Sequence, residues 1–444
     1  MKTKIAVVGC GPSGLCAIKN CISEGFEVVA FEQTSEIGGE WNSNLEVGPN
    51  VHSKIYEGLQ INFPKELMEF SDFSYDKNIT EVFLTPDKVQ NYFLKYTEKF
   101  DLRKHIKFNH KIINVRPIDD KWEIIVKDLK NDEYKTITCD KVLICVGIST
   151  PWIPKIEGLN DFEGKIIHSR DYRSTKMFEN KKVLLIGSGF SAFDIIIAID
   201  KVAEKVTWVR KIKEAHAPFL KIKLSSKSTE KTILIKRFTK SGAEFEDGSF
   251  EEFEIIAFAT GYDFTFPFLS VDSGISVYDK LVQPLYKQII NANRPSMAII
   301  GLPSFSLRMP MFELQIKFCM QYWSNRKIFP SKEEMLEDIQ KDFKLRGVYI
   351  NRNSHNAHYL GLKNHEFYYQ DLAETAGIAN IKICLIKMST HIGKHTFENF
   401  HTFRNFKYKI LNDFEFSCDC LENQKDENER NQNCVIAKML KLSI

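Results

Sequence analysis

The sequence contains no long hydrophobic run and no strong excess of charge of either sign. Its most apolar window, residues 183–199, is interrupted by two glycines, two serines and an aspartate, whereas a membrane-spanning helix needs about 18 consecutive apolar residues. The first apolar run leads directly into a glycine-rich turn and not into a signal-peptide pattern. The formal net charge of +3 gives no basic field that would bind nucleic acid. We therefore expect a cytoplasmic protein with no transmembrane anchor and no nucleic-acid partner.

Convincing metal and redox motifs are also missing, although the chain has ten cysteines. Cys16 and Cys21 have a C-x4-C spacing that some redox enzymes use for a disulfide. On a helix, however, five residues rotate the two side chains about 140° apart, which is poor geometry for a disulfide. Cys418 and Cys420 have no second cysteine pair or histidine cluster to complete a metal site. We predict reduced, mostly buried thiols and no metal.

The first 33 residues are typical of a dinucleotide-binding unit. A short apolar strand at residues 5–8 leads into Gly9, Gly11 and Gly14, which fit G-x-G-x-x-G, and a helix-like run and a second strand end at Glu32. In such a unit the glycines allow a tight turn, the approach of a pyrophosphate and close helix packing, while the acid binds the ribose hydroxyls. The cofactor-binding residues predicted here are Gly9, Gly11, Pro12, Ser13, Gly14, Glu32 and Gln33.

The same arrangement recurs after residue 182. Gly187, Gly189 and Ala192 fit G-x-G-x-x-A between two apolar runs, and Arg210 stands 23 residues after Gly187, as Glu32 stands 23 residues after Gly9. A guanidinium can bind the 2′-phosphate that an acid would repel, so this unit favours NADPH over NADH. The alternative is that Arg210 is only a solvated charge at a strand end. The cofactor-binding residues predicted here are Gly187, Ser188, Gly189, Ser191, Ala192, Arg210 and Lys211.

Two dinucleotide units in one chain are typical of flavoproteins that bring a hydride donor to a flavin, so we assign FAD to the first unit and NADPH to the second. The segment "GGEW" at residues 38–41 adds a glycine pair that could let backbone approach the flavin side of the first cofactor, or could simply make a turn. The residues assigned to FAD in this segment are Gly39, Glu40 and Trp41.

Several further motifs occur in a specific order. They are "GCGPSG" at 9–14, "GGEW" at 38–41, "YEGLQINFPK" at 56–65, "FEGKIIHSRDY" at 162–172, "FATGY" at 258–262 and "ELQ" at 313–315. Together they resemble the flavin-containing monooxygenases, a group of class B flavoprotein monooxygenases, over roughly residues 1–375. The fragment "FEGKIIHSRDY" matches the family fingerprint F-x-G-x-x-x-H-x-x-x-[YF] at every fixed position.

The resemblance implies an α/β fold with two Rossmann-like domains, the NADPH domain inserted in a discontinuous FAD domain. The expected boundaries are 1–153 and 267–375 for the FAD domain and 154–266 for the NADPH domain. A C-terminal extension at 376–444 is expected to be partly flexible, with the charged, amide-rich run 421–433 as an exposed loop or tail. Family likeness also leaves room for a homodimer and for peripheral association with the endoplasmic reticulum.

The activity implied is that of an NADPH- and O2-dependent monooxygenase of the N,N-dimethylaniline type. NADPH would reduce FAD, and the reduced flavin would add O2 to give a flavin hydroperoxide that oxygenates an amine nitrogen or a sulfide sulfur. Asn62 matches the family's active-site asparagine, whose amide is expected near flavin and nicotinamide. Its alternative role is a turn residue before Phe63 and Pro64. Gln315 matches a polar position near the flavin.

His168, the fixed histidine of the fingerprint, lies where the chain crosses from the FAD domain to the NADPH domain. We therefore expect it to hold the crossing in place, with Phe162 and Tyr172 packed beside it, and not to act as a general acid or base. Three other functions stay open. They are a Baeyer–Villiger monooxygenase, whose fingerprint ends in Trp where this chain has Tyr172, an uncoupled NADPH oxidase, and a non-catalytic NADPH-sensing flavoprotein.

Overall fold

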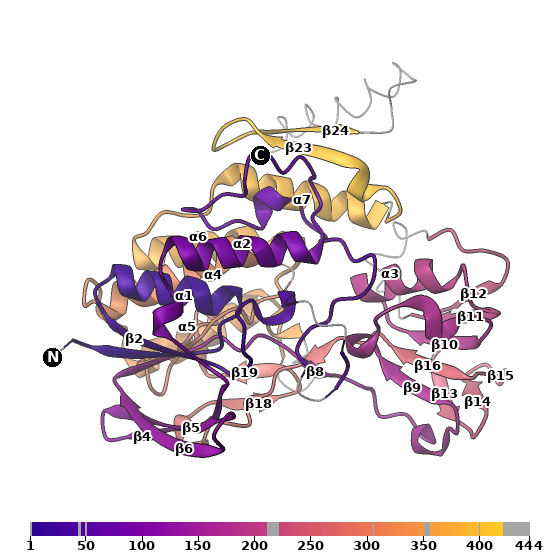
Figure 1. The fold of residues 1–444 in the computed structure, drawn as a ribbon, viewed down its shortest axis with the longest axis horizontal. Helices are drawn as coiled ribbons and strands as arrows, with labels where there is room; N and C mark the ends of the chain where they lie inside the picture. Colours follow the sequence, from indigo (N-terminus) through magenta and orange to yellow (C-terminus); the bar gives the residue numbers. More distant parts are fainter. Residues whose placement is uncertain are drawn as a thin grey trace.

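The computed structural model describes residues 2–42, 46–48, 51–210, 222–304, 306–349, 356–398 and 400–420. Two mainly parallel sheets lie side by side, and each contains one of the two glycine-rich turns (Figure 1). The sequence-based prediction of a two-domain α/β fold is confirmed by this arrangement.

The larger sheet has seven strands and is drawn from two separate parts of the chain, which makes this domain discontinuous. The strands β3, β2, β1, β7 and β22 run parallel, and β21 and β20 extend the sheet in antiparallel fashion. Their bounds are β1 (Lys4–Val8), β2 (Glu27–Glu32), β3 (Ile106–Phe108), β7 (Lys141–Ile144), β20 (Leu285–Tyr286), β21 (Ile290–Asn291) and β22 (Met297–Ile299).

Both faces of this sheet are buried, because successive side chains of a strand point to opposite faces. In β1, Ile5 and Val7 belong to the core under the helices, while Ala6 and Val8 belong to the core shared with an antiparallel three-stranded sheet. The helices on the first face are α1 (Pro12–Ser23), α2 (Pro86–Lys99) and α4 (Arg308–Trp323). The sheet on the second face is β4 (His110–Ile118), β5 (Lys121–Asp128) and β6 (Glu133–Cys139).

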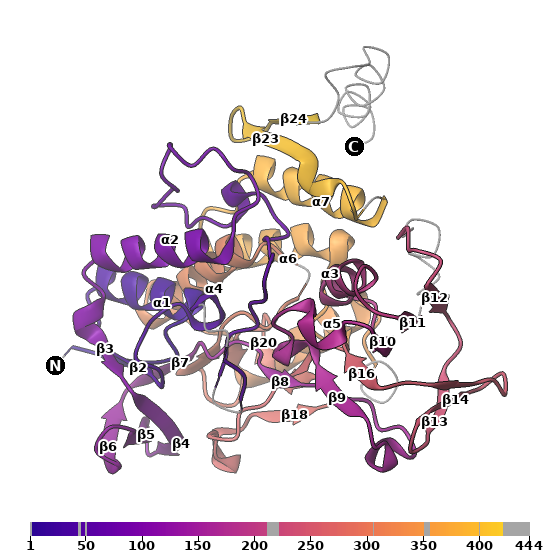
Figure 2. The same ribbon diagram turned by 45° about the vertical axis from the view of Figure 1, so that its right-hand side comes forward.

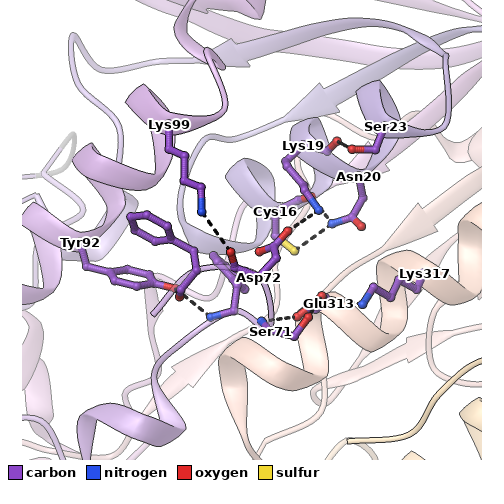
Figure 3. A network of polar contacts seen from close by, with 12 residues as sticks. Cys16, Lys19, Asn20, Ser23, Ser71, Asp72, Tyr92, Lys99, Glu313 and Lys317 are labelled. Carbon is purple, nitrogen blue, oxygen red and sulfur yellow. Dashed lines mark hydrogen bonds and ion pairs between the residues drawn. The ribbon is translucent and has the colours of Figure 1, made fainter. Parts of the chain in front are cut away.

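A polar network joins the helices on the first face (Figure 3). The backbone N–H of Ser71 donates to Glu313 Oε2 of α4 at 2.9 Å, and Lys317 Nζ lies 2.6 Å from Glu313 Oε1. Lys19 of α1 pairs with Asp72. Burial alone would raise the pKa of Glu313, but the hydrogen bonds from Lys317 and Ser71 lower it. The loop that carries Ser71 is thereby fixed between α1 and α4.

The second sheet is wholly parallel and comes from one continuous stretch of chain. Its order is β12-β11-β10-β16-β9, and a small antiparallel sheet packs beside it. The bounds are β9 (Lys165–His168), β10 (Lys182–Ile186), β11 (Lys205–Val209), β12 (Ser228–Lys231) and β16 (Ile255–Phe258), with helix α3 (Phe190–Ile199) after β10. The antiparallel sheet is β13 (Ile235–Phe238), β14 (Gly242–Phe245) and β15 (Phe250–Glu252).

The chain leaves the larger sheet and returns to it along two segments that pair with each other. Strands β8 (Thr150–Pro151) and β17 (Tyr262–Asp263) are antiparallel, with Thr150 opposite Asp263. The N–H of Trp152 donates to the carbonyl of Gly261 at 3.0 Å. Both crossings therefore run through one short ribbon.

The part of the extension that the structure describes is folded and packs on both domains. Helix α7 (Ile383–Glu398) lies above α6 (Gly361–Ala376), and the hairpin β23 (Phe406–Ile410) and β24 (Phe416–Cys420) lies above α7 (Figures 1 and 2). The Phe400 ring centre is 5.1 Å from that of Phe193 in α3. The run 421–433, expected to be a loop or tail, falls outside the described residues. Apart from short 3₁₀ helices, the other described elements are α5 (Lys332–Leu345), β18 (Ser276–Tyr278) and β19 (Leu281–Gln283).

Within the described ranges, no helix is long and apolar enough to cross a membrane. The same residues contain no group of three or more His, Cys, Asp or Glu side chains that could hold a metal ion. Cys16 and Cys21 are buried free thiols on α1, and burial raises the pKa of both.

Candidate functional site

A cavity of about 610 Å³ opens at the carboxyl ends of the parallel strands β1, β2 and β7. In an open α/β sheet this edge is where ligands bind. Residues that directly follow or end each strand form the wall: Val8, Gly9, Gly11, Pro12 and Ser13 after β1; Phe31, Glu32 and Gln33 at β2; and Cys145, Val146, Gly147, Ile148 and Ser149 after β7.

The first glycine-rich turn exposes bare backbone to this cavity. Gly9 has a φ of +94°, and a Cβ on Gly14 would lie only 1.9 Å from the carbonyl oxygen of Gly9, so no larger residue fits there. Helix α1 begins at Pro12, and no side chain caps its first turn. Its N–H groups and positive dipole end are therefore available to an anion such as a pyrophosphate. These residues fit the dinucleotide part of FAD.

Glu32 is held in place at the end of β2. It is 7% exposed, and its Oε2 accepts the Cys10 N–H at 2.9 Å while its Oε1 accepts the Thr34 N–H at 2.9 Å. A carboxylate has lone pairs beyond these two bonds. Glu32 and its neighbour Gln33 both line the cavity, which is consistent with the predicted role of Glu32 as an acceptor for ribose hydroxyls.

The "GGEW" segment packs against the first turn. Residues Gly39–Trp41 form one turn of 3₁₀ helix, and all three line the cavity. The Gly38 N–H donates to the Cys10 carbonyl at 3.0 Å, and a Cβ on Gly39 would lie 3.1 Å from Gly11 Cα. The segment is therefore a turn, which was the simpler of the two expectations from the sequence, and it also lines the cavity. Its contact with Gly11 places it beside the first turn.

The second glycine-rich turn has a similar shape and an open surface. Helix α3 begins at Phe190, with Gly189 as an uncapped N-cap. Ser188, Gly189 and Ser191 are exposed, and a Cβ on Gly189 would meet no atom within 4 Å. Ala192 is fully buried against the sheet. Backbone N–H groups at an open helix start fit the pyrophosphate of NADPH.

Arg210 is buried at the end of β11 and is not a solvated charge, so that alternative is wrong. It is 7% exposed, its Nε lies 2.7 Å from Glu230 Oε1, and its guanidinium carbon lies 4.5 Å from the ring centre of Trp208. A bound 2′-phosphate would share the guanidinium with Glu230. Lys211, also predicted to bind NADPH, lies outside the described residues.

Asn62 lies on a second, small cavity of about 10 Å³, with walls from Phe63, Phe190 of α3, and helices α6 and α7. Its Oδ1 accepts a hydrogen bond from Arg404 Nη2 at 2.5 Å. The alternative role, a turn residue that only precedes Phe63 and Pro64, does not account for this contact with residue 404.

Gln315 stands behind the wall of the large cavity. It is fully buried in α4, where its Oε1 accepts the Gly301 N–H at 2.9 Å and its Nε2 donates to the Tyr368 hydroxyl at 2.7 Å. Gly301 itself lines the cavity. Gln315 therefore supports the wall through the backbone of Gly301.

His168 ends strand β9 and is 3% exposed. Its Nδ1 accepts the Arg170 N–H at 3.1 Å, and its ring meets that of Tyr262, at the ribbon between the domains, with ring centres 5.2 Å apart. Burial lowers the pKa of His168 to about 4, so it is neutral near pH 7. Phe162 and Tyr172 are both buried. These contacts favour the linking role expected from the sequence.

The cationic side chains that line the large cavity are missing from the sequence predictions, and two of them, Lys54 and Arg308, make defined contacts. Lys54 Nζ lies 3.3 Å from Glu40 Oε2 and 4.1 Å from the ring centre of Tyr262. Arg308 starts α4 and donates to the Gly301 carbonyl at 3.1 Å, and burial lowers its pKa. Neither residue belongs to a local motif, and only the fold brings them to the cavity.

Comparison with known proteins agrees with this geometry. A family model described as flavin-binding monooxygenase-like matches residues 2–213 and 223–401. Senecionine N-oxygenase of Tyria jacobaeae is 28% identical over 97% of this chain and 94% of its own length. Flavin-containing monooxygenase 5 of Homo sapiens is 32% identical over 77% of each chain.

Solved structures give the same result. The S-allyl-L-cysteine S-oxygenase from Allium sativum superimposes with a TM-score of 0.82 at 26% identity, covering 91% of this chain and 95% of that one. The family resemblance, the fold and the pair of cofactors predicted from the sequence are confirmed. The chain belongs to the flavin-binding monooxygenase-like family and is an FAD- and NADPH-dependent monooxygenase.

Proposed function

We propose that this enzyme transfers one oxygen atom of O2 to a soft nucleophile, either an amine nitrogen or a sulfide sulfur. One observation carries the proposal: a single chain holds a dinucleotide-sized cavity beside one glycine-rich turn and a second glycine-rich turn that faces solvent. Relatives named as an N-oxygenase and an S-oxygenase support this substrate class.

The residues of the first turn, with Glu32 and Gly39, would hold FAD, and Gly187 to Ala192 with Arg210 would hold NADPH. Bound FAD would supply the activation of O2. Arg210 would select NADPH through its 2′-phosphate. We propose that residues 1–153 and 267–375 form the FAD domain and that residues 154–266 form the NADPH domain.

The chain's own contribution near the reacting atoms is positioning and exclusion of water. Asn62 has a neutral amide, which donates hydrogen bonds without releasing a proton. Met68, Met309 and Phe312 line the large cavity and are each at most 9% exposed. Such apolar walls keep water from the reacting centre. A neutral, buried His168 is unsuited to act as an acid near pH 7.

The test uses purified protein in air. We expect a yellow protein that oxidises NADPH and converts a thioether or a tertiary amine to its oxide, with mass spectrometry reading the product. Colourless protein that takes up no FAD would contradict the proposal. Hydrogen peroxide as the sole product would favour an oxidase, and an ester formed from a cyclic ketone would favour Baeyer–Villiger chemistry.

Two further proposals concern the state of the protein. The homodimer would be seen by size-exclusion chromatography with light scattering as twice the 51.5 kDa chain mass. Peripheral association with the endoplasmic reticulum would be seen by salt-sensitive co-fractionation with membranes. A monomer, or a protein that never sediments with membranes, would contradict the respective proposal.

A further inference from the structure

Arg404 lies three residues beyond the part of the chain that the family model matches, in a turn of 3₁₀ helix between α7 and the C-terminal hairpin. Its guanidinium reaches residues 61 and 62, far away in the sequence. Nε donates to the Ile61 carbonyl at 3.3 Å, and Nη2 donates to Asn62 Oδ1 at 2.5 Å. The C-terminal extension therefore contacts the asparagine that we place near the reacting atoms.

The chemistry of the guanidinium decides how the Asn62 amide is turned. Arginine has only N–H donors and no acceptor, so the amide atom that faces Arg404 is the oxygen. The Nδ2 of Asn62 must then point away from Arg404. If residue 404 could both donate and accept hydrogen bonds, or made no contact, either the Oδ1 or the Nδ2 end of the Asn62 amide could face it. Arg404 thus fixes which end of Asn62 is offered to its surroundings.

Arg404 is itself anchored on the NADPH domain. Its Nη1 lies 3.2 Å from Asp194 Oδ1 and its Nη2 lies 3.3 Å from Asp194 Oδ2, in helix α3. The Tyr56 hydroxyl donates to Asp194 Oδ2 at 2.7 Å. The side chains of Arg404 and Asp194 are only 17% and 16% exposed, and the guanidinium carbon lies 4.5 Å from the ring centre of Phe403. A two-point pair in such surroundings has one favoured geometry.

We propose that Arg404 is a positioning residue that orients the Asn62 carboxamide for the oxygenation reaction, with Asp194 as its anchor. This inference rests on the proposed function, because it assumes that the Asn62 amide faces flavin and nicotinamide. It assigns a task to the C-terminal extension and makes the orientation of Asn62 depend on where helix α3 of the NADPH domain stands.

The variants Arg404→Gln, Arg404→Lys, Asp194→Asn and Asn62→Ala test this, each as the FAD-loaded protein. Arg346→Gln is the matched control, because Arg346 is also a little-exposed arginine, paired with Asp342 at 2.7 Å and bonded to the Ala357 carbonyl. Two readouts are compared. One is the ratio of hydrogen peroxide to sulfoxide during NADPH oxidation with a thioether. The other, which needs no turnover, is the change in the flavin absorbance spectrum when NADP+ is added.

For Arg404→Gln we expect about a tenfold rise in the peroxide-to-sulfoxide ratio, the size of losing one hydrogen bond to a charged group, together with an altered NADP+ difference spectrum. Asp194→Asn should shift both readouts in the same direction by less, and Arg404→Lys should recover part of each. The double variant of Arg404→Gln with Asn62→Ala should be no worse than Asn62→Ala alone, because Arg404 acts through Asn62. The control should keep both wild-type readouts.

Additive effects in the double variant, or equal changes in the Arg346→Gln control, would show that Arg404 only stabilises the fold and would overturn the inference. So would an Asn62→Ala variant that keeps both wild-type readouts. A wild-type enzyme that binds FAD but forms neither a sulfoxide nor an amine oxide would remove the proposed function instead, while the difference spectra would still decide the role of Arg404. Colourless wild-type protein would remove both.

Discussion

In the first glycine-rich turn the backbone lines a cavity, whereas in the second it faces solvent. Gly11, Pro12 and Ser13 line a cavity of about 610 Å³, and the "GGEW" segment closes on Gly11. In the second turn a Cβ on Gly189 would touch nothing. The same local motif thus serves two kinds of ligand. A turn that lines a large cavity suits a cofactor that stays bound through many turnovers, and a turn on the open surface suits one that binds and leaves each time.

The largest expected effect comes from exchanging the third position of the two motifs. Gly14→Ala places a Cβ 1.9 Å from the Gly9 carbonyl, a backbone clash that should exceed the usual cost of overpacking, about 1–3 kcal/mol. We expect loss of bound flavin, read from the visible absorbance of the purified protein. Ala192→Gly should keep its flavin and lose only about 1 kcal/mol of unfolding free energy. Yellow, stable Gly14→Ala protein would contradict the comparison.

The next largest effect concerns the residue 23 positions after the first glycine of each motif, which is Glu32 in the first unit and Arg210 in the second. Arg210→Ala should raise the Michaelis constant for NADPH far more than that for NADH, by an amount equivalent to about 2–4 kcal/mol, because two charge-assisted hydrogen bonds are lost. Steady-state kinetics with both coenzymes measures this. Glu230→Gln is the control, since it removes the partner of Arg210 and should not weaken NADPH binding. Equal changes for NADPH and NADH in Arg210→Ala would refute the 2′-phosphate assignment.

Glu32→Gln should have a smaller effect on the first unit. The amide keeps the size of the carboxylate but loses its charge, and one end of it would face the Cys10 or Thr34 N–H with a donor. We expect FAD affinity to fall by about 1–2 kcal/mol, measured by titrating FAD into the apoprotein. The affinity for NADPH should not change, and a loss at both sites would mean that the variant perturbs the whole fold.

The last effect appears only at acidic pH and concerns the crossing between the two units. The pKa of His168 is lowered to about 4 in the folded protein, against about 6.5 when unfolded. The unfolded state therefore binds the proton first, and stability present above pH 6.5 is lost as pH falls toward 4. His168→Gln should lose less stability over this window, measured by urea unfolding at several pH values. If the His168→Gln variant shows the same pH dependence of stability as the wild type, the pKa of His168 is not lowered by folding.

Local signals explain how much of this could be predicted. The strand, turn and helix of both units fall within a few residues of the expected positions, because the glycine pattern and the apolar runs specify them locally. Order along the chain also identified the family and its discontinuous FAD domain. The roles of the individual site residues, Asn62 and Arg210 among them, stay predictions.

Contacts between distant parts of the chain could not be predicted. Arg404 and Asn62 are 342 residues apart, and Arg404 and Asp194 are 210 apart. No spacing rule connects them. The one hint is a lone arginine among aromatic residues in "FHTFRNF", at 400–406. The burial of Arg210 against Trp208 and Glu230 was missed for the same reason, since Glu230 comes from another strand.

The ribbon of β8 and β17 gives the inserted domain neighbouring ends. Thr150 and Asp263 face each other across paired strands, where Cα atoms are about 5 Å apart. Residues 152–261 are thus a cassette: cutting it out would leave two chain ends that a short turn could join. Adjacent ends let such a cassette be gained, lost or exchanged without rerouting the host chain, although the contacts of Phe400 and Arg404 with helix α3 would be lost with it. Because the ends of the cassette are adjacent, residues 152–261 can be excised from this chain or inserted into a related one. Such experiments would ask whether either unit folds without the other.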